Sequence, residues 1–328
     1  MSQPQGARTP RPVVIDTDPG IDDALAILLA LRSEELRVEL LTTVAGNVSI
    51  QDTTANARRV LSWLAPTPCP IVAQGAARPL RRRLHTAVAV HGDDGLGGIT
   101  AYRHADGRLQ YPAPAYPVAQ GRGVQQLLRM VERHGRELTV IALGPLTNIA
   151  RAIQLAPEIM QRLGQLVVMG GAIGVPGNIS PVAEFNIFAD PHAADVVFRA
   201  GLPTTLVPLD VTRQVRLTRT MLAQASHGAP SPLLPILHDL TQHALQREEA
   251  GMPLHDPLAV AVAIDPSLVT RTCMPVHVET KGQYTLGMTV VDQRSPAACP
   301  ESTPRLAVAL AVDAPRVLTL LLTRLLAL

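Results

Sequence analysis

Short apolar runs alternate with helix-length segments along most of the chain, and this alternation is the strongest constraint on its fold. The apolar runs occupy residues 13–16, 38–45, 138–143, 165–171 and 204–209. The segments with helical patterning occupy residues 22–33, 52–64, 123–134, 146–155 and 191–200. Uninterrupted apolar runs are typical of strands buried on both faces, and intervening helices indicate parallel crossovers. The sequence therefore predicts an α/β, Rossmann-like fold: a mostly parallel open sheet flanked by helices.

The length and composition favour one domain with an aliphatic core. A chain of 328 residues is within the range of a large α/β unit, so we expect a single domain over residues 13–328 after a flexible tail over residues 1–12. Hydrophobic residues make up 47% of the chain and aromatic residues only 2%, so aliphatic side chains must fill the core. The net charge of +2 gives no general indication of nucleic-acid binding.

The cysteines and the chain ends favour a cytoplasmic protein without membrane association. Cys69, Cys273 and Cys299 show neither metal-type spacing nor a disulfide pattern, which suits a reducing compartment. The polar N-terminal tail has no signal-peptide core. The leucine-rich residues 317–328 are too few to span a bilayer and include Arg324, so they predict a docked helix.

Two stretches interrupt the alternation. Residues 79–117 contain several prolines and a glycine-rich segment, and we expect a long loop with little regular structure. The three arginines at residues 81–83 lack interleaved aromatic residues, so a solvated loop is a simpler interpretation than a nucleic-acid surface. Residues 213–252 have helical but polar patterning, which predicts a helical cap near the active site.

Polar clusters follow the predicted strands. Asp16 and Asp18 follow one strand, Asn47 follows the next, and Asn148 and the pair Gly170–Gly171 follow two later ones. In parallel sheets, ligands bind beyond the carboxyl ends of the strands. We therefore expect these clusters to converge on one crevice.

The first cluster is acidic and lies in the segment VVIDTDPGIDDA, residues 13–24. Its aspartates, Asp16, Asp18, Asp22 and Asp23, repel one another at neutral pH unless solvent separates them or a cation binds them. Asp22 could simply cap the following helix, but a cap does not explain Asp16 and Asp18. A site made only of oxygen ligands suits Ca²⁺ or Mg²⁺ better than zinc, so the segment favours metal binding.

A strand followed by an Asp-x-Asp motif also opens the haloacid-dehalogenase-type phosphatases, in which the first aspartate is the nucleophile. Those enzymes also use a lysine late in the core. This chain has a single lysine, Lys281, in a predicted strand–turn region with no acidic pair after it. The phosphatase interpretation is therefore disfavoured.

A second cluster lies in the segment GNISPVAEFNIFAD, residues 177–190. Asn178, Glu184 and Asn186, around Phe185, supply the amides and the carboxylate needed to bind a vicinal diol such as ribose. An asparagine-rich turn is the alternative interpretation.

A third cluster is the pair His255 and Asp256 at the start of an apolar helix. Asp256 is either a helix cap or a ligand of the same metal as the distant aspartates. His255 is either a structural residue or a catalytic acid.

A set of motifs occurs in one order along most of the chain. They are DTDPGIDDA at residues 16–24, AGN at 45–47, HGDDGLGG from His91, LGPLTN from Leu143, MGG from Met169, AEFN at 183–186 and HD at 255–256. A single such match is weak, but the ordered set is specific. On these motifs the sequence resembles the inosine-uridine preferring nucleoside hydrolase family.

The resemblance implies a calcium-dependent enzyme that hydrolyses ribonucleosides to free base and ribose. It implies that Ca²⁺ is held by Asp18, Asp23, the backbone carbonyl of Leu143 and Asp256, with a water and two ribose hydroxyls completing the shell. Asp18 would also be the general base, and Asp16 would lie behind the site. The resemblance assigns sugar binding to Asp22, Asn47, Asn178, Glu184 and Asn186, and to Met169 by packing. Phe185, within the same loop, is a further candidate for substrate binding.

Cleavage of an N-ribosidic bond passes through an oxocarbenium-like sugar, so the site must stabilise positive charge, activate water and help the base to leave. Clustered carboxylates suit the first task, and a metal with Asp18 suits the second. His255 is the candidate for the third. His91 is a candidate base-pocket residue or an alternative acid.

The identity of the base is the least constrained point. In purine-handling members, aromatic residues between the AEFN and HD motifs help to bind or protonate the base, and residues 213–254 contain no Phe, Tyr or Trp. This absence mildly favours pyrimidine nucleosides, and hydrolysis of another N-riboside or calcium-dependent nucleoside binding without catalysis are the alternatives. The resemblance also implies a homodimer or homotetramer. The polar candidates for the base pocket are His227, His238, Gln242, His243, Arg247 and Glu248.

Overall fold

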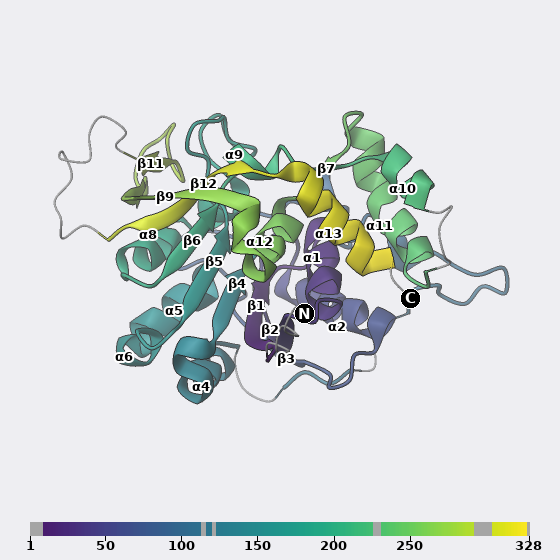
Figure 1. Ribbon diagram of the computed structural model, residues 1–328, viewed down its shortest axis with the longest axis horizontal. Coiled ribbons are helices and arrows are strands. Elements are labelled where there is room, and N and C mark those ends of the chain that lie inside the picture. The colour runs from purple at the N-terminus through teal and green to yellow at the C-terminus, as the bar shows by residue number, and fades with distance from the viewer. Residues whose placement is uncertain (1–8, 113–115, 120–122, 226–230, 292–303, 327–328) are drawn as a thin grey trace, which may run out of the picture.

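An eight-stranded sheet forms the centre of the computed structural model, which describes residues 9–112, 116–119, 123–225, 231–291 and 304–326 (Figure 1). Neighbouring strands are parallel except at one edge, where β9 pairs antiparallel with β12. The prediction of a mostly parallel open sheet is confirmed. In spatial order the strands are β3 (Ile71–Gln74), β2 (Leu36–Thr43), β1 (Arg11–Thr17), β4 (Thr139–Ala142), β5 (Gln165–Met169), β6 (Thr204–Val207), β12 (Leu306–Val312) and β9 (Val269–Met274).

Helices cover both faces of this sheet (Figure 1). One face packs against α1 (Ile21–Leu31), α2 (Ile50–Leu64), α11 (Leu234–Arg247), α12 (His255–Ile264) and α13 (Ala314–Leu326). The other face packs against α4 (Gly123–His134), α5 (Thr147–Leu155), α6 (Pro157–Met160) and α8 (Pro191–Arg199). Shorter helices are α3 (Val88–His91), α7 (Phe185–Ala189), α9 (Leu209–Thr212) and α10 (Arg219–Ala225).

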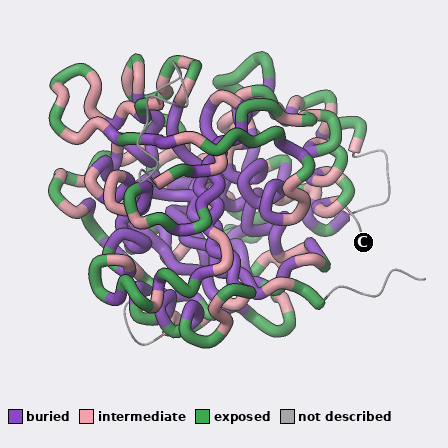
Figure 2. Tube along the Cα trace, turned by 60° about the vertical axis from the view of Figure 1, so that its left-hand side comes forward, coloured by how far each residue is buried: buried purple, intermediate pink, exposed green. Residues whose placement is uncertain are grey.

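The central strands are buried on both faces, as their apolar runs predicted. In β1, Val13 and Ile15 pack in one cluster and Val14 packs in the other, because successive side chains of a strand point to opposite faces. Burial of each such side chain contributes about 1.5–3 kcal/mol to folding. Figure 2 shows the buried residues gathered in the interior, with exposed residues toward the periphery.

The structure extends or adds several elements. β1 begins at Arg11, two residues before the predicted strand, because Arg11 and Pro12 pair with Leu36 and Arg37 of β2. The strands β3, β9 and β12 were not predicted. β3 has only four residues, and β9 is an edge strand whose side chains are mostly exposed, so neither carries a long apolar signal. Two short pairs were also missed: β10 (Val276–Val278) with β11 (Thr289–Val291), and β7 (Arg216–Leu217) with β8 (Met252–Pro253).

The two stretches that break the alternation form the surroundings of the site. Within residues 79–117, the regular elements among the described residues are α3 and the short 3₁₀ turn Ile99–Ala101. Residues 213–252 supply α10 and α11, which lie together at one end of the molecule (Figure 1). The predicted C-terminal helix is α13, docked through Val317, Leu321 and Leu325. No helix in the described parts of the chain is long and apolar enough to cross a membrane.

Candidate active site

The carboxyl end of β1 is the base of the site. β1 lies between β2 and β4, so the segments that follow these three strands meet at one edge of the sheet. Asp16 is buried at this end, and its Oδ1 accepts hydrogen bonds from Thr42 Oγ1 (2.5 Å) and Asn148 Nδ2 (2.7 Å). Burial raises the pKa of Asp16 to about 6.

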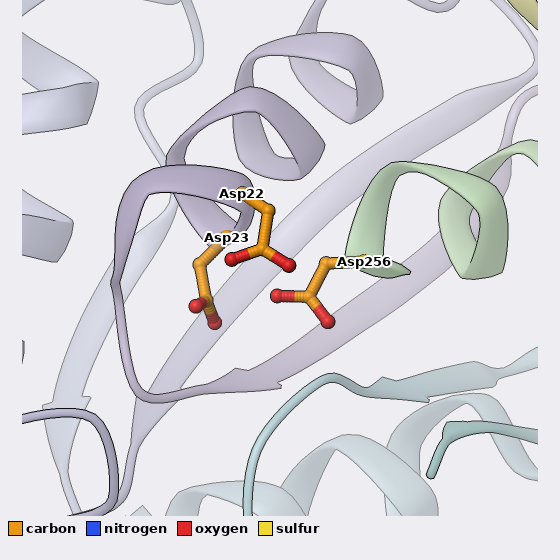
Figure 3. A group of neighbouring side chains, drawn as sticks. All are labelled: Asp22, Asp23 and Asp256. Atoms are coloured by element: carbon orange, nitrogen blue, oxygen red, sulfur yellow. The ribbon is translucent and has the colours of Figure 1, made fainter. Parts of the chain in front are cut away.

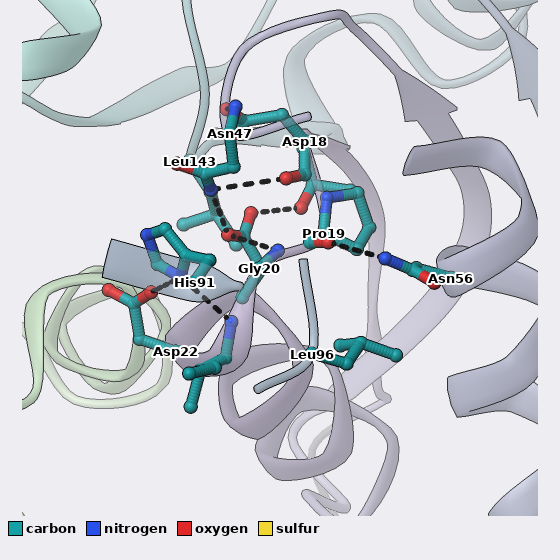
Figure 4. Close-up of polar contacts among 12 residues, drawn as sticks. Asp18, Pro19, Gly20, Asp22, Asn47, Asn56, His91, Leu96 and Leu143 are labelled. Atoms are coloured by element: carbon teal, nitrogen blue, oxygen red, sulfur yellow. Dashed lines mark hydrogen bonds and ion pairs between the residues drawn. The ribbon is translucent and has the colours of Figure 1, made fainter. Parts of the chain in front are cut away.

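Asp18 follows two residues later, in the tight turn shown in Figure 4. Its Oδ2 accepts a hydrogen bond from Asn47 N (2.7 Å), and its backbone carbonyl accepts one from Asn47 Nδ2 (3.1 Å). Gly46 and Gly144 approach so closely that a side chain at either position would overlap the Asp18 carboxylate. The other oxygen, Oδ1, is buried and has no hydrogen-bond partner among the described residues. Burial, reinforced by the charge of Asp23, raises the pKa of Asp18 well above its ordinary value.

Asp23 closes the first turn of α1. The N-cap residue is Gly20, whose amide donates to Asp23 Oδ2 (2.9 Å). Asn47 Nδ2 donates to the same oxygen (3.0 Å), and Thr17 Oγ1 donates to Asp23 Oδ1 (2.5 Å). Asp23, and not Asp22, therefore accepts from the cap residue. The Asp22 carboxylate interacts instead with the backbone amides of Asp22 and Asp23 at the start of this helix.

Asp22, Asp23 and Asp256 form a compact group of buried carboxylates (Figure 3). One oxygen of each lies within 4.8 Å of the others, and Asp256 comes from the first turn of α12. Burial raises the pKa of Asp22 to about 6, and burial with the charges of Asp22 and Asp23 raises the pKa of Asp256 well above its ordinary value. The repulsion is relieved when a cation binds, so the group could hold a metal ion.

The donor set fits a hard cation. The group offers carboxylate oxygens, and the unpartnered Oδ1 of Asp18 adds another oxygen nearby. The backbone carbonyl of Leu143 lies at the same site, where it accepts a hydrogen bond from Asn186 Nδ2 (2.6 Å). Carboxylate and carbonyl oxygens are the ligands that Ca²⁺ and Mg²⁺ prefer. Of the four ligands that the resemblance implies, the compact group includes Asp23 and Asp256. Its third member is Asp22 and not Asp18.

The segment around α7 faces this group from the other side of the pocket. Glu184 is the N-cap of α7 and accepts hydrogen bonds from Asn186 N (2.9 Å), Ile187 N (3.1 Å) and Gly171 N (3.1 Å). Asn178 Oδ1 accepts from Phe185 N (2.8 Å), which holds the loop before the helix. Burial raises the pKa of Glu184 to about 7.

A cavity of about 420 Å³ joins these residues, a volume suited to a small organic ligand. Every nucleoside-binding residue that the resemblance indicated lines it. So do His91, Leu143, His255 and Asp256, although Asp18 and Asp23 do not. The lining residues that sequence reasoning missed include Ile21, His85, Val90, Ile179, Met252 and Pro253. Ile21 and Ile179 lie inside quoted segments but are apolar, and the others lie outside the motifs, so only the tertiary structure identifies them as lining residues.

The two candidate histidines lie on the pocket wall in defined orientations. His91 Nδ1 accepts a hydrogen bond from Ile21 N (3.1 Å), so the ring proton is on Nε2. His255 Nδ1 shares a hydrogen bond of 2.7 Å with Thr212 Oγ1. Burial lowers the pKa of His91 to about 4 and that of His255 to about 3, so both rings are neutral at pH 7.

The predicted helical cap contributes to the pocket through one end of α11. Ala244, Arg247 and Glu248 line the cavity. His243 packs instead beside Gly97 of the glycine-rich loop. His238 and Gln242 are not among the lining residues, and His227 lies outside the described residues.

The glycine-rich loop after His91 is organised by Asp94. Its carboxylate accepts hydrogen bonds from Leu96 N (2.8 Å), Gly98 N (2.9 Å), Thr100 N (3.0 Å) and Thr100 Oγ1 (2.8 Å). Although burial opposes the shift, these bonds hold the pKa of Asp94 below its ordinary value. The backbone of Asp94 also accepts a hydrogen bond from Asn56 Nδ2 (2.7 Å).

We therefore expect Asp94→Ala to loosen this loop while the exposed neighbouring change, Asp93→Ala, does not. Loss of an acceptor that serves several donors costs about 1–3 kcal/mol, so amide exchange at residues 96–100 should accelerate about tenfold or more. Hydrogen–deuterium exchange measures this directly. Equal exchange in both variants would contradict the role of Asp94.

The geometry defines a pocket with a buried group of carboxylates that could hold a cation and with amide and carboxylate groups beside it. The sequence profile described as "Inosine-uridine preferring nucleoside hydrolase" matches residues 13–319. The chain therefore belongs to the inosine-uridine preferring nucleoside hydrolase family, and it is an N-glycosyl hydrolase that acts on nucleosides.

Individual relatives agree with this assignment. The pyrimidine-specific ribonucleoside hydrolase RihA of Shewanella woodyi is 39% identical over 289 residues, which cover 86% of this chain and 88% of the relative. RihA of Salmonella paratyphi C is 37% identical over 287 residues, with the same coverage.

Solved structures are similarly close. The plant nucleoside hydrolase PpNRh1 superimposes with a TM-score of 0.88 at 35% identity, covering 97% of this chain and 100% of that one. A purine-preferring ribonucleoside hydrolase from Gardnerella vaginalis has a TM-score of 0.86 at 33% identity, covering 96% and 98%.

Proposed function

We propose that this enzyme is calcium-dependent, hydrolyses the N-glycosidic bond of ribonucleosides to free base and ribose, and favours pyrimidine nucleosides. The observation that carries the proposal is the group Asp22, Asp23 and Asp256, buried at one end of a nucleoside-sized pocket. Three carboxylates in this arrangement call for a divalent cation, and the polar groups opposite suit a ribose.

Asp18, Asp23, Asp256 and the Leu143 carbonyl would hold the ion. When bound, Ca²⁺ polarises a water and the ribose hydroxyls that share its coordination shell. Asp18 accepts the proton of the attacking water, and this role is supported by its two unlike oxygens. Asn47 N donates to Oδ2, whereas Oδ1 accepts no hydrogen bond from the described residues.

The remaining polar residues of the pocket bind the sugar. Asp22, Asn47, Asn178, Glu184 and Asn186 would accept from or donate to the ribose hydroxyls, and Met169 and Phe185 would pack against the ring. The buried carboxylates beside the sugar also favour the positive charge that develops at C1′ as the bond to the base breaks.

The preference for pyrimidines is supported by two observations. The RihA relatives carry the description pyrimidine-specific. The α11 wall offers Ala244, Arg247 and Glu248 and no aromatic side chain to stack on a purine. The purine-preferring relative from Gardnerella vaginalis makes inosine and adenosine necessary controls.

A substrate panel tests the proposal. Uridine, cytidine, inosine and adenosine are incubated with the enzyme and Ca²⁺, and free ribose is measured. We expect uridine and cytidine to release ribose with a higher kcat/KM than inosine and adenosine. No ribose from any of the four would contradict the calcium-dependent hydrolase, and higher kcat/KM for purines would contradict the base preference.

The leaving-group role of His255 predicts a dependence on the departing group. His255→Ala should lower kcat for uridine by about 10²-fold, because the departing base loses the hydrogen bond that the neutral His255 ring can donate to it. A riboside of 4-nitrophenolate, which leaves readily as an anion, should be affected much less. An equal loss on both substrates would point to a binding role. The same comparison with His91→Ala tests the alternative acid.

We also propose a homodimer or homotetramer in solution. Light scattering at several protein concentrations measures the mass, and a monomer at all concentrations would contradict this assignment.

A further inference from the structure

The middle residue of the basic run at residues 81–83 is packed against the protein, although the sequence suggested a solvated loop. Arg82 is half-buried, whereas Arg81 and Arg83 are exposed. The guanidinium carbon of Arg82 lies 4.2 Å from the centroid of the Phe188 ring. The same guanidinium donates a hydrogen bond to the backbone carbonyl of Phe188. A stacked and hydrogen-bonded arginine of this kind holds two segments together.

Phe188 belongs to α7, two residues after Asn186. Its ring also meets the edge of the His85 ring, with centroids 5.6 Å apart and planes at 80°. Next to this contact, Leu80 N donates to Asp190 Oδ2 (2.7 Å). The segment from Leu80 to His85 therefore contacts α7 through Phe188, and it contacts Asp190 directly after α7.

This segment leads directly into one wall of the nucleoside pocket. Residues His85, Thr86, Ala87, Ala89, Val90 and His91 line the cavity. Along this wall, Ala87 N donates to the carbonyl of Asn47 (2.9 Å), and His91 accepts from Ile21 N. These two contacts join the wall to the β1 side of the site, and Arg82 joins it to the opposite side, which carries Glu184 and Asn186.

We propose that Arg82 is a positioning residue: by clamping Phe188 it holds the wall at residues 85–91 at a fixed distance from α7, and it thereby sets the affinity for the nucleoside. Arg82 does not line the cavity, so it acts through the wall and not by contact with the substrate. The inference rests on the proposed function of this pocket.

The neighbouring arginines provide matched controls for the test. KM and kcat for uridine and inosine are measured for Arg82→Met, Arg81→Met and Arg83→Met, together with Tm. We expect Arg82→Met to raise KM about tenfold with kcat within about twofold of wild type, because binding is weakened uniformly. Arg81→Met and Arg83→Met should match wild type. Arg82→Lys, which keeps the charge and a donor, should recover part of the lost affinity.

A double-mutant cycle identifies the partner. Phe188→Leu removes the ring, and in that background Arg82→Met should raise KM by clearly less than it does in wild type. Additive effects would overturn the clamp. So would an unchanged KM in Arg82→Met, a loss in kcat alone, or an equal rise in KM for all three arginine variants.

Binding measurements separate this inference from the proposed function. In the Asp18→Asn background, the Kd of uridine and inosine is measured by calorimetry with Ca²⁺, with and without Arg82→Met. A roughly tenfold weaker Kd supports the clamp even if no nucleoside is hydrolysed, and an equal Kd overturns it. If Arg82→Met lowers Tm markedly, its weaker binding could result from unfolding, and the Kd of Arg82→Lys is then the test of the positioning role. Wild-type stability with intermediate affinity supports the positioning role, whereas wild-type affinity overturns it.

Discussion

Asp18→Asn is expected to lower kcat for nucleoside hydrolysis by about 10³-fold or more while the protein remains folded. The asparagine oxygen can still accept the hydrogen bond from Asn47 N, so the turn after β1 should keep its shape. The amide group that replaces Oδ1 cannot take a proton from water. Ribose release measures kcat, and circular dichroism with a thermal scan measures folding.

The control for this variant is the same aspartate-to-asparagine substitution at an exposed position. Asp93→Asn removes a carboxylate at an exposed position beside the glycine-rich loop and should leave kcat unchanged. Calorimetric titration with Ca²⁺ distinguishes loss of the base from loss of the ion: turnover should stay low even when the variant is saturated. Turnover close to wild type would exclude Asp18 as the base.

Removal of divalent metal is expected to abolish turnover and to lower Tm, with the larger loss of stability at higher pH. Burial raises the pKa of Asp16 and Asp22 to about 6, and the pKa values of Asp18, Asp23 and Asp256 are also raised. Carboxyl groups whose pKa is raised by folding destabilise the metal-free protein fully above the raised pKa. This destabilisation diminishes as pH falls from the raised pKa toward the ordinary value of the group. The difference in Tm between the calcium-bound and the metal-free protein should therefore be smaller at pH 5.5 than at pH 8.

The size of the effect follows from binding linkage. Ca²⁺ at 100 times its Kd stabilises the folded state by about 2.7 kcal/mol, which raises Tm by about 4 °C in a chain of 328 residues. Thermal scans at pH 5.5 and pH 8, with chelator and then with added Ca²⁺, measure this difference. Asp256→Asn is the matched variant and should lose most of the response to Ca²⁺. Full turnover in chelator, or an equal Ca²⁺ shift at both pH values, would count against the site.

Local sequence patterns predicted the elements that build the site. The helices at residues 52–64, 123–134 and 191–200 were predicted within two residues of their observed ends, because amphipathic periodicity is a property of each segment alone. The central parallel strands were predicted for the same reason. β9 was missed because an exposed edge strand carries no long apolar run. β12 was also missed, although its sequence LAVALAV is an apolar run and it pairs with β6 as well as with β9.

Contacts between distant residues were not predictable. Thr212 beside His255, Thr42 and Asn148 on Asp16, and Arg82 on Phe188 join residues that are 26 to 132 positions apart. None of these pairs has a spacing that indicates contact. At the start of α1, Asp22 and Asp23 are equally plausible cap residues from sequence, and only the turn at Gly20 brings the Asp23 carboxylate to the cap amide.

The sequence by itself determined the fold class, the order of the motifs and the chemical character of the site, because alternating periods and clustered aspartates after a strand are local signals. Only the tertiary structure decided which carboxylates form the compact group, which residues wall the nucleoside pocket, and that one arginine of three clamps that wall. The physical reason is that the order of strands in the sheet determines the distances between motifs. That order depends on packing across the whole chain and not on the neighbours of any one residue.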